Sequence, residues 1–534
     1  MAAGRLMNRR AFLGRTAMAG VLAASGGALA ACGSGAASQK TTTSSSAKAR
    51  RGGHLSVGMS GGSGADSIDA LYSFTYLDSA RQQQLYNPLL QMNDAAEIEY
   101  QLAESIEPQK GNTEWIIRLR PGVTFHNGKD LGAEDVIYSF RGILNPKSPA
   151  PGASSLGPMD AAGLTALDKL TVKVPFTAPF GSFLEQLTYW YYLWIVPVGY
   201  DPKKPVGTGP FKYQSFTPGQ RSTFVRNENY WKPGLPYLDA VTTIDFADNT
   251  ALQNALVTGV VDGAGALEGA QIKELAAQTG ITTVISPSGQ ITPFTMRVDR
   301  APYSDVRVRL ALRLIVNRPD LIASAFDGYA TLAHDVFSPW DPDFDASAFH
   351  REQDIPQAKA LLKAAGQEHL SLQLVTSAVT IGTVQMATVL AGQAAAAGVT
   401  IKLNQVDPTA FFGPNYLQWT FSQDFYNYSP YLAQVAQSFL PHSPYNETHW
   451  AKPGPPKIGP HYVSLYNQAN ATTNLGLRRE IEHEMQMIDY TEGGYIIPCF
   501  PDGLDAYSST VHGPAPTKVG QPFSNFDFEH FYLA

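Results

Sequence analysis

One serine lies in a pattern that could support nucleophilic catalysis. Gly58-Met59-Ser60-Gly61-Gly62 fits the Gly-x-Ser-x-Gly elbow of hydrolases, in which a strained turn between a strand and a helix exposes the serine hydroxyl. Three more small residues follow at the point where that helix should begin. No further motif offers the base and the orienting group that such a nucleophile needs. We therefore expect no enzyme activity, and a hydrolase is the alternative that loss of activity in Ser60→Ala would support.

Histidines and a cysteine are the other residues with reactive or metal-binding side chains. His126 lies in a turn with no carboxylate at metal-ligand spacing, so we interpret it as structural. His442, His449 and His461 are spaced by seven and twelve positions in a proline-rich stretch, which matches no compact metal-binding pattern. Cys499 lies in an apolar segment and is interpreted as an inert core thiol. We expect no metal site and no cofactor.

Length, composition and charge exclude further classes of function. The 534 residues exceed a single typical core, so two or three domains are expected. An apolar fraction of 44% is that of a globular protein, and 25 tyrosines with 26 phenylalanines suit a ligand cleft as well as a core. Residues 1–31 carry four arginines and no acid, and without them the formal net charge falls from −7 to −11. This charge argues against a nucleic-acid partner.

The amino terminus has the features of an export signal. Arg9 and Arg10 precede an alanine-rich and glycine-rich apolar run at 16–31. That run is too short and too mildly hydrophobic for a stable membrane span, which needs about 20 strongly apolar residues. The order of these features predicts a twin-arginine (Tat) signal peptide at residues 1–31.

A lipid-attachment motif follows the export signal. Leu29-Ala30-Ala31-Cys32-Gly33 fits a lipobox, in which a signal peptidase cuts before the cysteine and the thiol is acylated. Cys32 is therefore the predicted lipid-attachment site. Residues 32–53 lack the apolar side chains needed for packing and are expected to form a flexible tether. The mature protein would then be anchored at the outer face of the cytoplasmic membrane.

Several segments predict the elements that would position a site. VGTGPFKYQSFTPGQRSTFVRNENYWKPGLPYLD at 206–239 predicts two antiparallel strands joined by a turn at Pro218-Gly219. WIIRLRPGVTFHNGKDLGAEDVIYSF at 115–140 predicts a strand, a turn and a helix. A strand, a helix and a second strand are expected at 370–376, 384–397 and 399–406. That order predicts α/β packing with a parallel pair.

Together with Pro302-Tyr303-Ser304-Asp305-Val306-Arg307-Val308-Arg309, these blocks resemble extracytoplasmic solute-binding proteins of family 5. The family comprises the peptide, dipeptide and nickel type receptors of ABC importers. The resemblance implies an α/β, two-lobed periplasmic-binding-protein-like fold (type II, cluster C) with an extra small domain inserted in the first lobe. It also implies a permease with its ATPase as partners, and we expect a monomer. The expected division is 54–91, 206–293 and 500–534 for the first lobe, 92–205 for the inserted domain and 294–499 for the second lobe.

The resemblance indicates where a solute would bind. Peptide receptors of the family carry a Gly-Trp segment followed by an aspartate that holds the α-amino group of the peptide. Here that region is 418–431, the Gly-Trp pair is missing, and Asp424 precedes the expected acid position. The residues expected to contact the solute are Tyr72, Phe74 and Tyr76 in a loop, Arg297, and Trp419, Asp424, Tyr426, Asn427 and Tyr428.

Two features leave the kind of solute open. Arg297 stands where the family usually has asparagine, so it either places a cation near the cleft or forms a salt bridge with Asp299. Residues 189–194 contain five aromatic side chains in six positions, so some of them must meet solvent, a ligand or another domain. The expected solute is peptide-like. The alternatives are a sugar, an opine or a metal chelate, and a sensor or chaperone role for the same fold.

Overall fold

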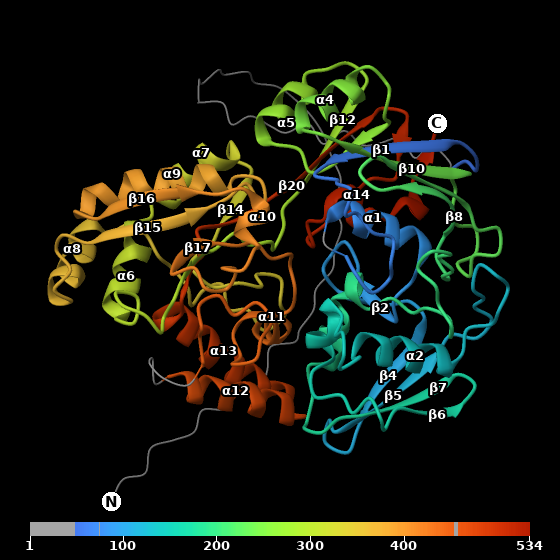
Figure 1. Cartoon of the computed structure of the whole chain (residues 1–534), viewed down its shortest axis with the longest axis horizontal. Coiled ribbons are helices and arrows are strands. Elements are labelled where there is room, and N and C mark those ends of the chain that lie inside the picture. Colours follow the sequence, from blue (N-terminus) through green and yellow to red (C-terminus); the bar gives the residue numbers. More distant parts are fainter. Residues whose placement is uncertain (1–48, 74, 453–457) are drawn as a thin grey trace, which may run out of the picture. The chain divides into compact units, whose positions relative to one another are not determined.

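The computed structural model describes residues 49–73, 75–452 and 458–534. Its largest sheet has seven strands in the order β12-β20-β11-β1-β10-β9-β8 (Figure 1). β1 is parallel to β10 and β11, and the other neighbouring strands are antiparallel. Segments far apart in the sequence therefore meet in one sheet. Its strands are β1 (His54–Ser60), β8 (Phe211–Thr217), β9 (Arg221–Arg226), β10 (Ala240–Phe246), β11 (Gly263–Ala264), β12 (Ile281–Ser286) and β20 (Gly503–Ser508).

The hairpin predicted within 206–239 is confirmed as β8 and β9. Gly219 in its turn has a φ of +69°, a conformation that glycine adopts without strain. Gly207 precedes β8 and crosses the end of α1 (Tyr76–Leu85), where an added Cβ would lie 2.0 Å from the backbone oxygen of Leu85. Only a residue without a side chain permits this close approach.

A buried arginine attaches α1 to the sheet. Arg81 is fully buried, and its guanidinium donates to Asp66 at 2.9 Å, to Asp245 on β10 at 2.5 Å and to Ser222 on β9 at 2.7 Å. A buried charge is stable only when it is paired and hydrogen-bonded. These contacts fix α1, which begins at Tyr76, and the loop before it, which contains Tyr72.

The segment 92–205 contains a four-stranded antiparallel sheet in the order β4-β5-β7-β6. The predicted strand and helix at 115–140 are present as β5 and α2, and the buried faces of both join one apolar core that extends to the seven-stranded sheet. Whether 92–205 is a separate domain stays a prediction. The elements here are β4 (Ala103–Gln109), β5 (Glu114–Leu119), α2 (Ala133–Ile143), β6 (Thr165–Asp168), β7 (Thr171–Pro175) and α3 (Phe183–Leu187).

The segment 294–499 forms a different set of sheets. β15 and β16 are the predicted parallel pair, joined by α9. A three-stranded sheet in the order β17-β13-β18 lies beside β15. The strands are β13 (Phe294–Met296), β14 (Ala330–Leu332), β15 (Ser371–Thr376), β16 (Thr400–Gln405), β17 (Phe421–Gln423), β18 (Tyr495–Ile496) and β19 (Cys499–Pro501). The helices are α6 (Val306–Ile315), α7 (Arg318–Phe326), α8 (Ile355–Ala364), α9 (Thr383–Ala394), α10 (Pro408–Phe411), α11 (Tyr431–Ser438), α12 (Gly459–Ala471) and α13 (Leu475–Glu492).

The remaining elements are short and lie around the seven-stranded sheet and its neighbours. α14 follows β20 after another short strand, and its residues Phe523, Ser524 and Asn525 have positive φ values of 55°, 52° and 62°. The elements are β2 (Leu90–Met92), β3 (Ile98–Tyr100), α4 (Asn249–Val257), α5 (Gly269–Ala276), β21 (Val511–His512), α14 (Pro522–Phe526) and β22 (Tyr532–Leu533). Across the described ranges, every helix is too short or too polar to cross a membrane.

Two predicted elements have different bounds in the structure. The sequence of 79–90 favours a helix, but α1 begins at Tyr76, where Thr75 caps it, and ends at Leu85, after which Tyr86 is extended two residues before Pro88. The apolar sequence of 495–500 favours a single strand, but the structure divides it into β18 and β19 at Pro498. Proline has no N–H to donate to a sheet, so it interrupts the pairing.

Candidate ligand-binding site

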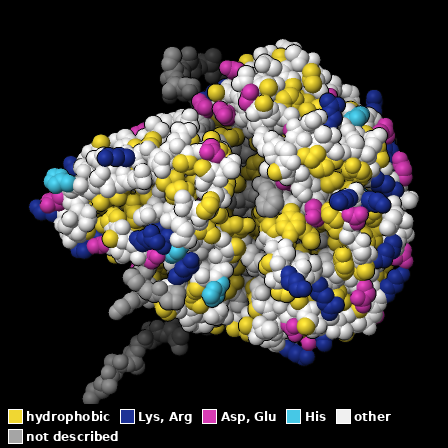
Figure 2. Space-filling view, in the orientation of Figure 1, with side chains coloured by type: hydrophobic (Ala, Val, Ile, Leu, Met, Phe, Trp, Pro, Cys, Tyr) yellow, Lys and Arg dark blue, Asp and Glu magenta, His cyan; other side chains and the backbone are white. Residues whose placement is uncertain are grey.

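A cavity of about 460 Å³ lies between residues 189–192 and the segment 412–445. This volume is within the range of small-molecule sites. Figure 2 shows hydrophobic side chains on both sides of the hollow between the left and right parts of the view. The cavity is lined by Tyr189, Tyr191, Tyr192, Phe412, Tyr416, Asp424, Phe425, Tyr426, Asn427, Gln437 and Tyr445.

Direct hydrogen bonds connect the two walls of this cavity. The hydroxyl of Tyr189 lies 3.1 Å from Ser429 Oγ, to which it donates. Gln437 on α11 accepts from Ser154 Oγ at 3.0 Å and donates to Ser155 Oγ at 2.9 Å. Three tyrosines of the aromatic run at 189–194 line the cavity, and Trp194 is fully buried. The run is therefore divided between the cavity wall and the core.

Two buried carboxyl groups lie at the back of the cavity. Asp424 is 3% exposed, and it accepts from the Tyr416 hydroxyl and from the Phe425 N–H, both at 2.8 Å. Glu447 is 4% exposed and accepts from the hydroxyls of Tyr426 and Tyr495. The two carboxyls are close enough for each to affect the pKa of the other. Among the described residues, no lysine, arginine or histidine forms an ion pair with either one.

The electrostatics of the pair follow from its burial. Burial raises the pKa of Glu447 well above its ordinary value, and the neighbouring Asp424 carboxyl raises it further. Burial also raises the pKa of Asp424, whereas the hydrogen bonds from Glu447 and Tyr416 lower it. Of the two carboxyls, Asp424 is the one that lines the cavity, and none of the described residues in that lining is cationic.

A narrower space of about 60 Å³ continues from this region toward the seven-stranded sheet. Phe425 and Tyr426 line both spaces. Tyr76 donates to Asn427 Oδ1 at 3.2 Å and accepts from Gln290 at 3.2 Å. The structure thus brings together four of the residues expected to contact a solute: Tyr76, Asp424, Tyr426 and Asn427.

Four other expected residues are not placed on these two spaces. Tyr72 lies near the surface, with its hydroxyl 3.3 Å from Ser148 Oγ. Tyr428 is 6% exposed and packs in a small apolar cluster with Met92, Ala96 and Val519. Trp419 lines a separate groove beside β15, and its ring nitrogen donates to the Phe411 backbone oxygen at 3.2 Å. Phe74 and Cys32 lie outside the described residues.

Arg297, the fourth, is held by Asp299. Its Nε and Nη2 donate to the two carboxylate oxygens of Asp299, each at 2.7 Å. Such a two-point ion pair satisfies the guanidinium charge. Of the two interpretations of Arg297, the salt bridge is the one that the structure has, so no cation is supplied to the cavity.

Five tyrosines that line the cavity, together with Glu447, are missing from the solute contacts that the sequence predicted. The aromatic run at 189–192 did indicate a contact surface, because its side chains could not all be buried on one face. The sequence around Glu447 gave none, because Asn446-Glu447-Thr448 resembles an ordinary polar loop. The left-out residues are Tyr189, Tyr191, Tyr192, Tyr416, Tyr445 and Glu447.

The other candidate chemistries have structural explanations. Ser60 ends β1 and donates to Asn249 Oδ1 at 2.6 Å, and the next helix begins only at Tyr76, so the strand-turn-helix of a nucleophile elbow is missing. His126 accepts from the Gly207 N–H at 3.3 Å and donates to the Gly209 oxygen at 3.0 Å. Burial lowers the pKa of His126 to about 4, so its ring is neutral at physiological pH. The two hydrogen bonds of the ring fix the residues that lead into β8.

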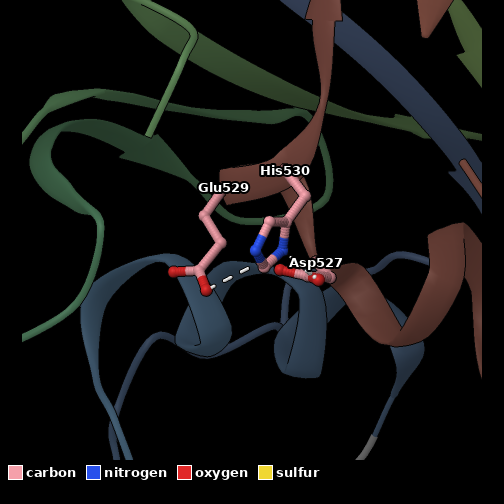
Figure 3. A group of neighbouring side chains, drawn as sticks. All are labelled: Asp527, Glu529 and His530. Carbon is pink, nitrogen blue, oxygen red and sulfur yellow. Dashed lines mark hydrogen bonds and ion pairs between the residues drawn. The ribbon is translucent and has the colours of Figure 1, made fainter. Parts of the chain in front are cut away.

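A polar group of three side chains lies outside the cavity, near the carboxyl end. Asp527 and Glu529 flank the His530 ring above α1 (Figure 3). His530 Nδ1 lies 2.5 Å from Asp527 Oδ2, and Glu529 Oε1 accepts from Lys232 Nζ at 2.6 Å. The ion pairs to Lys232 and His530 offset part of the acidic charge, and this group gives no sign of a ligand of its own.

The chain belongs to a known family. Residues 97–455, more than half of the chain, match "Bacterial extracellular solute-binding proteins, family 5 Middle". The glutathione-binding protein GsiB of Pectobacterium atrosepticum is 29% identical over 317 residues, which cover 57% of this chain and 60% of that protein. The alignment thus spans less than two thirds of the relative. These findings confirm the family resemblance that the sequence blocks indicated.

Solved structures confirm the fold. The PBP AgaA in complex with agropinic acid, from A. tumefaciens R10, superposes with a TM-score of 0.78 at 20% identity, covering 90% of this chain and 99% of that one. The periplasmic binding protein DppA from Helicobacter pylori, in complex with the peptide STSA, gives a TM-score of 0.76 at 21% identity, with 91% and 98% coverage. The fold is therefore the two-lobed α/β fold of periplasmic binding proteins.

Proposed function

We propose that this protein is the solute-binding component of an ABC importer and that it captures a peptide-like solute in the cavity at Asp424. A permease with its ATPase would receive the loaded form. The single observation that supports this best is a tyrosine-lined cavity with a buried carboxylate that lacks a counter-charge, within a family 5 fold. A solute that contacts both walls would favour the closed state by its differential affinity for that state.

The chemistry of the walls selects the proposed solute. Apart from Asp424, the described residues that line the larger cavity are neutral, and most are aromatic. Aromatic faces suit apolar and planar groups, and a buried carboxylate suits an ammonium with which it forms a strong charge-assisted hydrogen bond. A peptide-like solute with a free amino group has both. A solute that is bound mainly through carboxylates would need cations that this cavity lacks.

A panel of solutes tests the proposal. Purified mature protein is mixed with tripeptides, glutathione, sugars, an opine and nickel-histidine, and its thermal unfolding is followed. We expect amine-bearing peptides to raise the melting temperature, since a ligand at 100 times its Kd adds about 2.7 kcal/mol of stability. Asp424→Asn should abolish the increase and Trp419→Phe, outside the cavity, should keep it. If no solute class stabilises the protein, the proposal is wrong.

We also propose that the protein is lipid-anchored through Cys32 on the outer face of the cytoplasmic membrane, after export by the twin-arginine route. The lipobox at 29–33 and the paired Arg9 and Arg10 support this proposal. Cys32→Ser should move the protein from the membrane fraction to the soluble extracytoplasmic fraction. Arg9→Lys with Arg10→Lys should leave it inside the cell. Persistence of Cys32→Ser protein in the membrane fraction would contradict the anchor.

A further inference from the structure

We infer that Asp341, Asp343 and Glu482 form a calcium site that joins the loop between β14 and α8 to helix α13. One carboxylate oxygen from each residue takes part in a group whose oxygens all lie within 4.8 Å of one another. Ca²⁺ binds carboxylate and amide oxygens at about 2.3–2.6 Å, so this spacing suits a single ion held among the three. None of the three residues lines the cavity at Asp424, and the inference does not depend on the proposed solute.

The loop between β14 and α8 places its two aspartates side by side. The Asp343 N–H donates to Asp341 Oδ1 at 2.8 Å, and Asp341 Oδ2 accepts from the Tyr431 N–H at 2.8 Å. Asp341 is thereby fixed between its own loop and the start of α11. Glu482 is 1% exposed and reaches the two aspartates from α13. The carboxylates come together from distant segments, so the spacing of residues in the sequence predicted no metal site here.

A buried amide oxygen beside these carboxylates has no hydrogen-bond partner. Gln486 is fully buried, and its Oε1 is unpaired. Its Nε2 donates to the backbone oxygen of Asp343 at 3.2 Å, and because Nε2 and Oε1 share one carbon atom, Oε1 also lies at the loop. Gln486 is one turn from Glu482, so both side chains lie on the same face of α13. An unpaired buried oxygen is costly, and a bound cation would satisfy it.

The charge of the group favours a divalent cation. Glu185 on α3 joins the group through Arg478, which donates to both Glu185 and Glu482. Oε2 of Glu185 is also buried without a hydrogen-bond partner. In the described part of the chain, the ion pairs of these four carboxylates are formed by Arg478 and by Arg479, which pairs with Asp343. When all four carboxylates are ionised, two negative charges remain, and Ca²⁺ would neutralise both.

The donor atoms select calcium among the common cations. The candidate ligands are all oxygens, which suit Ca²⁺ better than Zn²⁺, Cu²⁺ or Ni²⁺. Mg²⁺ usually keeps several water ligands, whereas Ca²⁺ accepts a site built mainly from protein oxygens. Glu482 and Gln486 are almost completely buried, so their side of the site is closed to water.

A bound ion would also stabilise the contact between the two walls of the cavity. It would hold the loop at Asp341 against α13, and Arg478 extends the connection from α13 to Glu185 on α3. Asp341 in turn holds the first N–H of α11, the helix that carries Gln437 in the cavity lining. The ion is therefore expected to stabilise the protein in the absence of any solute.

The inference is tested with purified mature protein that has been treated with a chelator and contains no added solute. Calorimetric titration with CaCl₂ should show one site per chain with a Kd of about 1 mM or below, and Ca²⁺ should raise the melting temperature more than Mg²⁺ does. Absence of both binding and stabilisation at about 10 mM Ca²⁺, roughly tenfold above the Kd of the weakest extracellular calcium sites, would overturn the inference.

Variants then locate the ion. Asp343→Asn combined with Glu482→Gln should abolish Ca²⁺ binding. Gln486→Met removes the amide oxygen at similar side-chain length and should weaken Ca²⁺ binding by about tenfold or more, and it decides the matter if the double variant does not fold. Asp345→Asn is the matched control, because Asp345 lies in the same loop but bonds to Ser347, and it should keep the wild-type Kd. An unchanged Kd in Gln486→Met, or an equal loss in Asp345→Asn, would contradict the site.

Discussion

Two groups of buried acids in the segment 294–499 differ in how their charge is compensated. Asp335 is 2% exposed and forms ion pairs with Arg318 at 2.9 Å and with Arg351 at 2.6 Å. Asp424 and Glu447 are as deeply buried, but only hydroxyl and amide groups donate to them. The charge of Asp335 is neutralised within the chain by Arg318 and Arg351. The second group is left with a charge that a solute can neutralise.

The difference also appears in the pKa of each acid. Burial alone would raise the pKa of Asp335, but the charges of Arg318 and Arg351 outweigh it and hold the pKa below its ordinary value. Burial raises the pKa of Glu447, and no cation opposes the effect. Paired charges of the first kind hold a fold together, whereas uncompensated ones in a cavity mark a functional site.

Asp335→Asn should have the largest effect on stability. It leaves two buried guanidinium groups without a counter-charge, and breaking a buried pair in this way costs about 3–5 kcal/mol. Urea unfolding of the variant measures the loss. Asp424→Asn should reduce the free energy of unfolding by less than about 1 kcal/mol, since it removes a charge that has no ion-pair partner and keeps a side-chain oxygen that can accept a hydrogen bond. Equal losses in the two variants would remove the distinction between the two groups.

Asp424→Asn should instead have a large effect on binding. Loss of one partner of a buried charged hydrogen bond costs about 2–5 kcal/mol, which is roughly a 30-fold to several-thousand-fold weaker Kd. Titration calorimetry with a tripeptide that stabilises the wild type measures this change. Arg297→Gln is the control, and it should change the Kd by less than threefold, because Arg297 already pairs with Asp299.

The dependence of stability on pH should distinguish the two acids by sign. A raised carboxyl pKa means that the folded protein binds the proton more tightly, so the contribution of Glu447 is present at low pH and is lost as the pH rises above 4.5 toward its folded pKa. Asp335, with a lowered pKa, contributes above its ordinary value and loses that contribution as the pH falls below 3.8. Glu447→Gln should therefore be more stable relative to wild type at pH 8 than at pH 5, by about 1.4 kcal/mol for every tenfold difference in proton affinity between the folded and unfolded chains. An unchanged difference between these pH values would contradict a raised pKa.

Trp419→Phe should have the smallest effect. It removes one hydrogen bond to the Phe411 oxygen, which contributes about 1 kcal/mol to stability, and it keeps the aromatic packing. Binding of the tripeptide should be unchanged, because Trp419 lines the groove beside β15 and not the cavity. A tenfold change in Kd would mean that the site extends beyond the cavity described above.

The sequence predicted local elements well where turn chemistry and periodicity agree. The hairpin of β8 and β9 and the parallel pair of β15 and β16 are both present. The ends of α1 and the division between β18 and β19 were missed, because proline effects on neighbouring residues compete with a continuous apolar pattern.

The candidate site was harder to predict, since its residues come from distant segments. Asp424, Tyr426 and Asn427 follow β17 and could be inferred from the family pattern. Glu447 lies in an irregular loop whose sequence has no periodicity, and only the folded chain brings it to Asp424. The resemblance placed Trp419 and Tyr428 with the site, but Trp419, ahead of β17, lines the groove beside β15, and Tyr428 packs with Met92, Ala96 and Val519.

A crystal structure of the mature protein with a tripeptide from the stabilising set tests the central claim most directly. We predict the peptide in the cavity between residues 189–192 and 412–445, with its amino group within hydrogen-bond distance of Asp424. A peptide bound in the groove of Trp419, or in the cavity with its carboxylate at Asp424, would contradict the account.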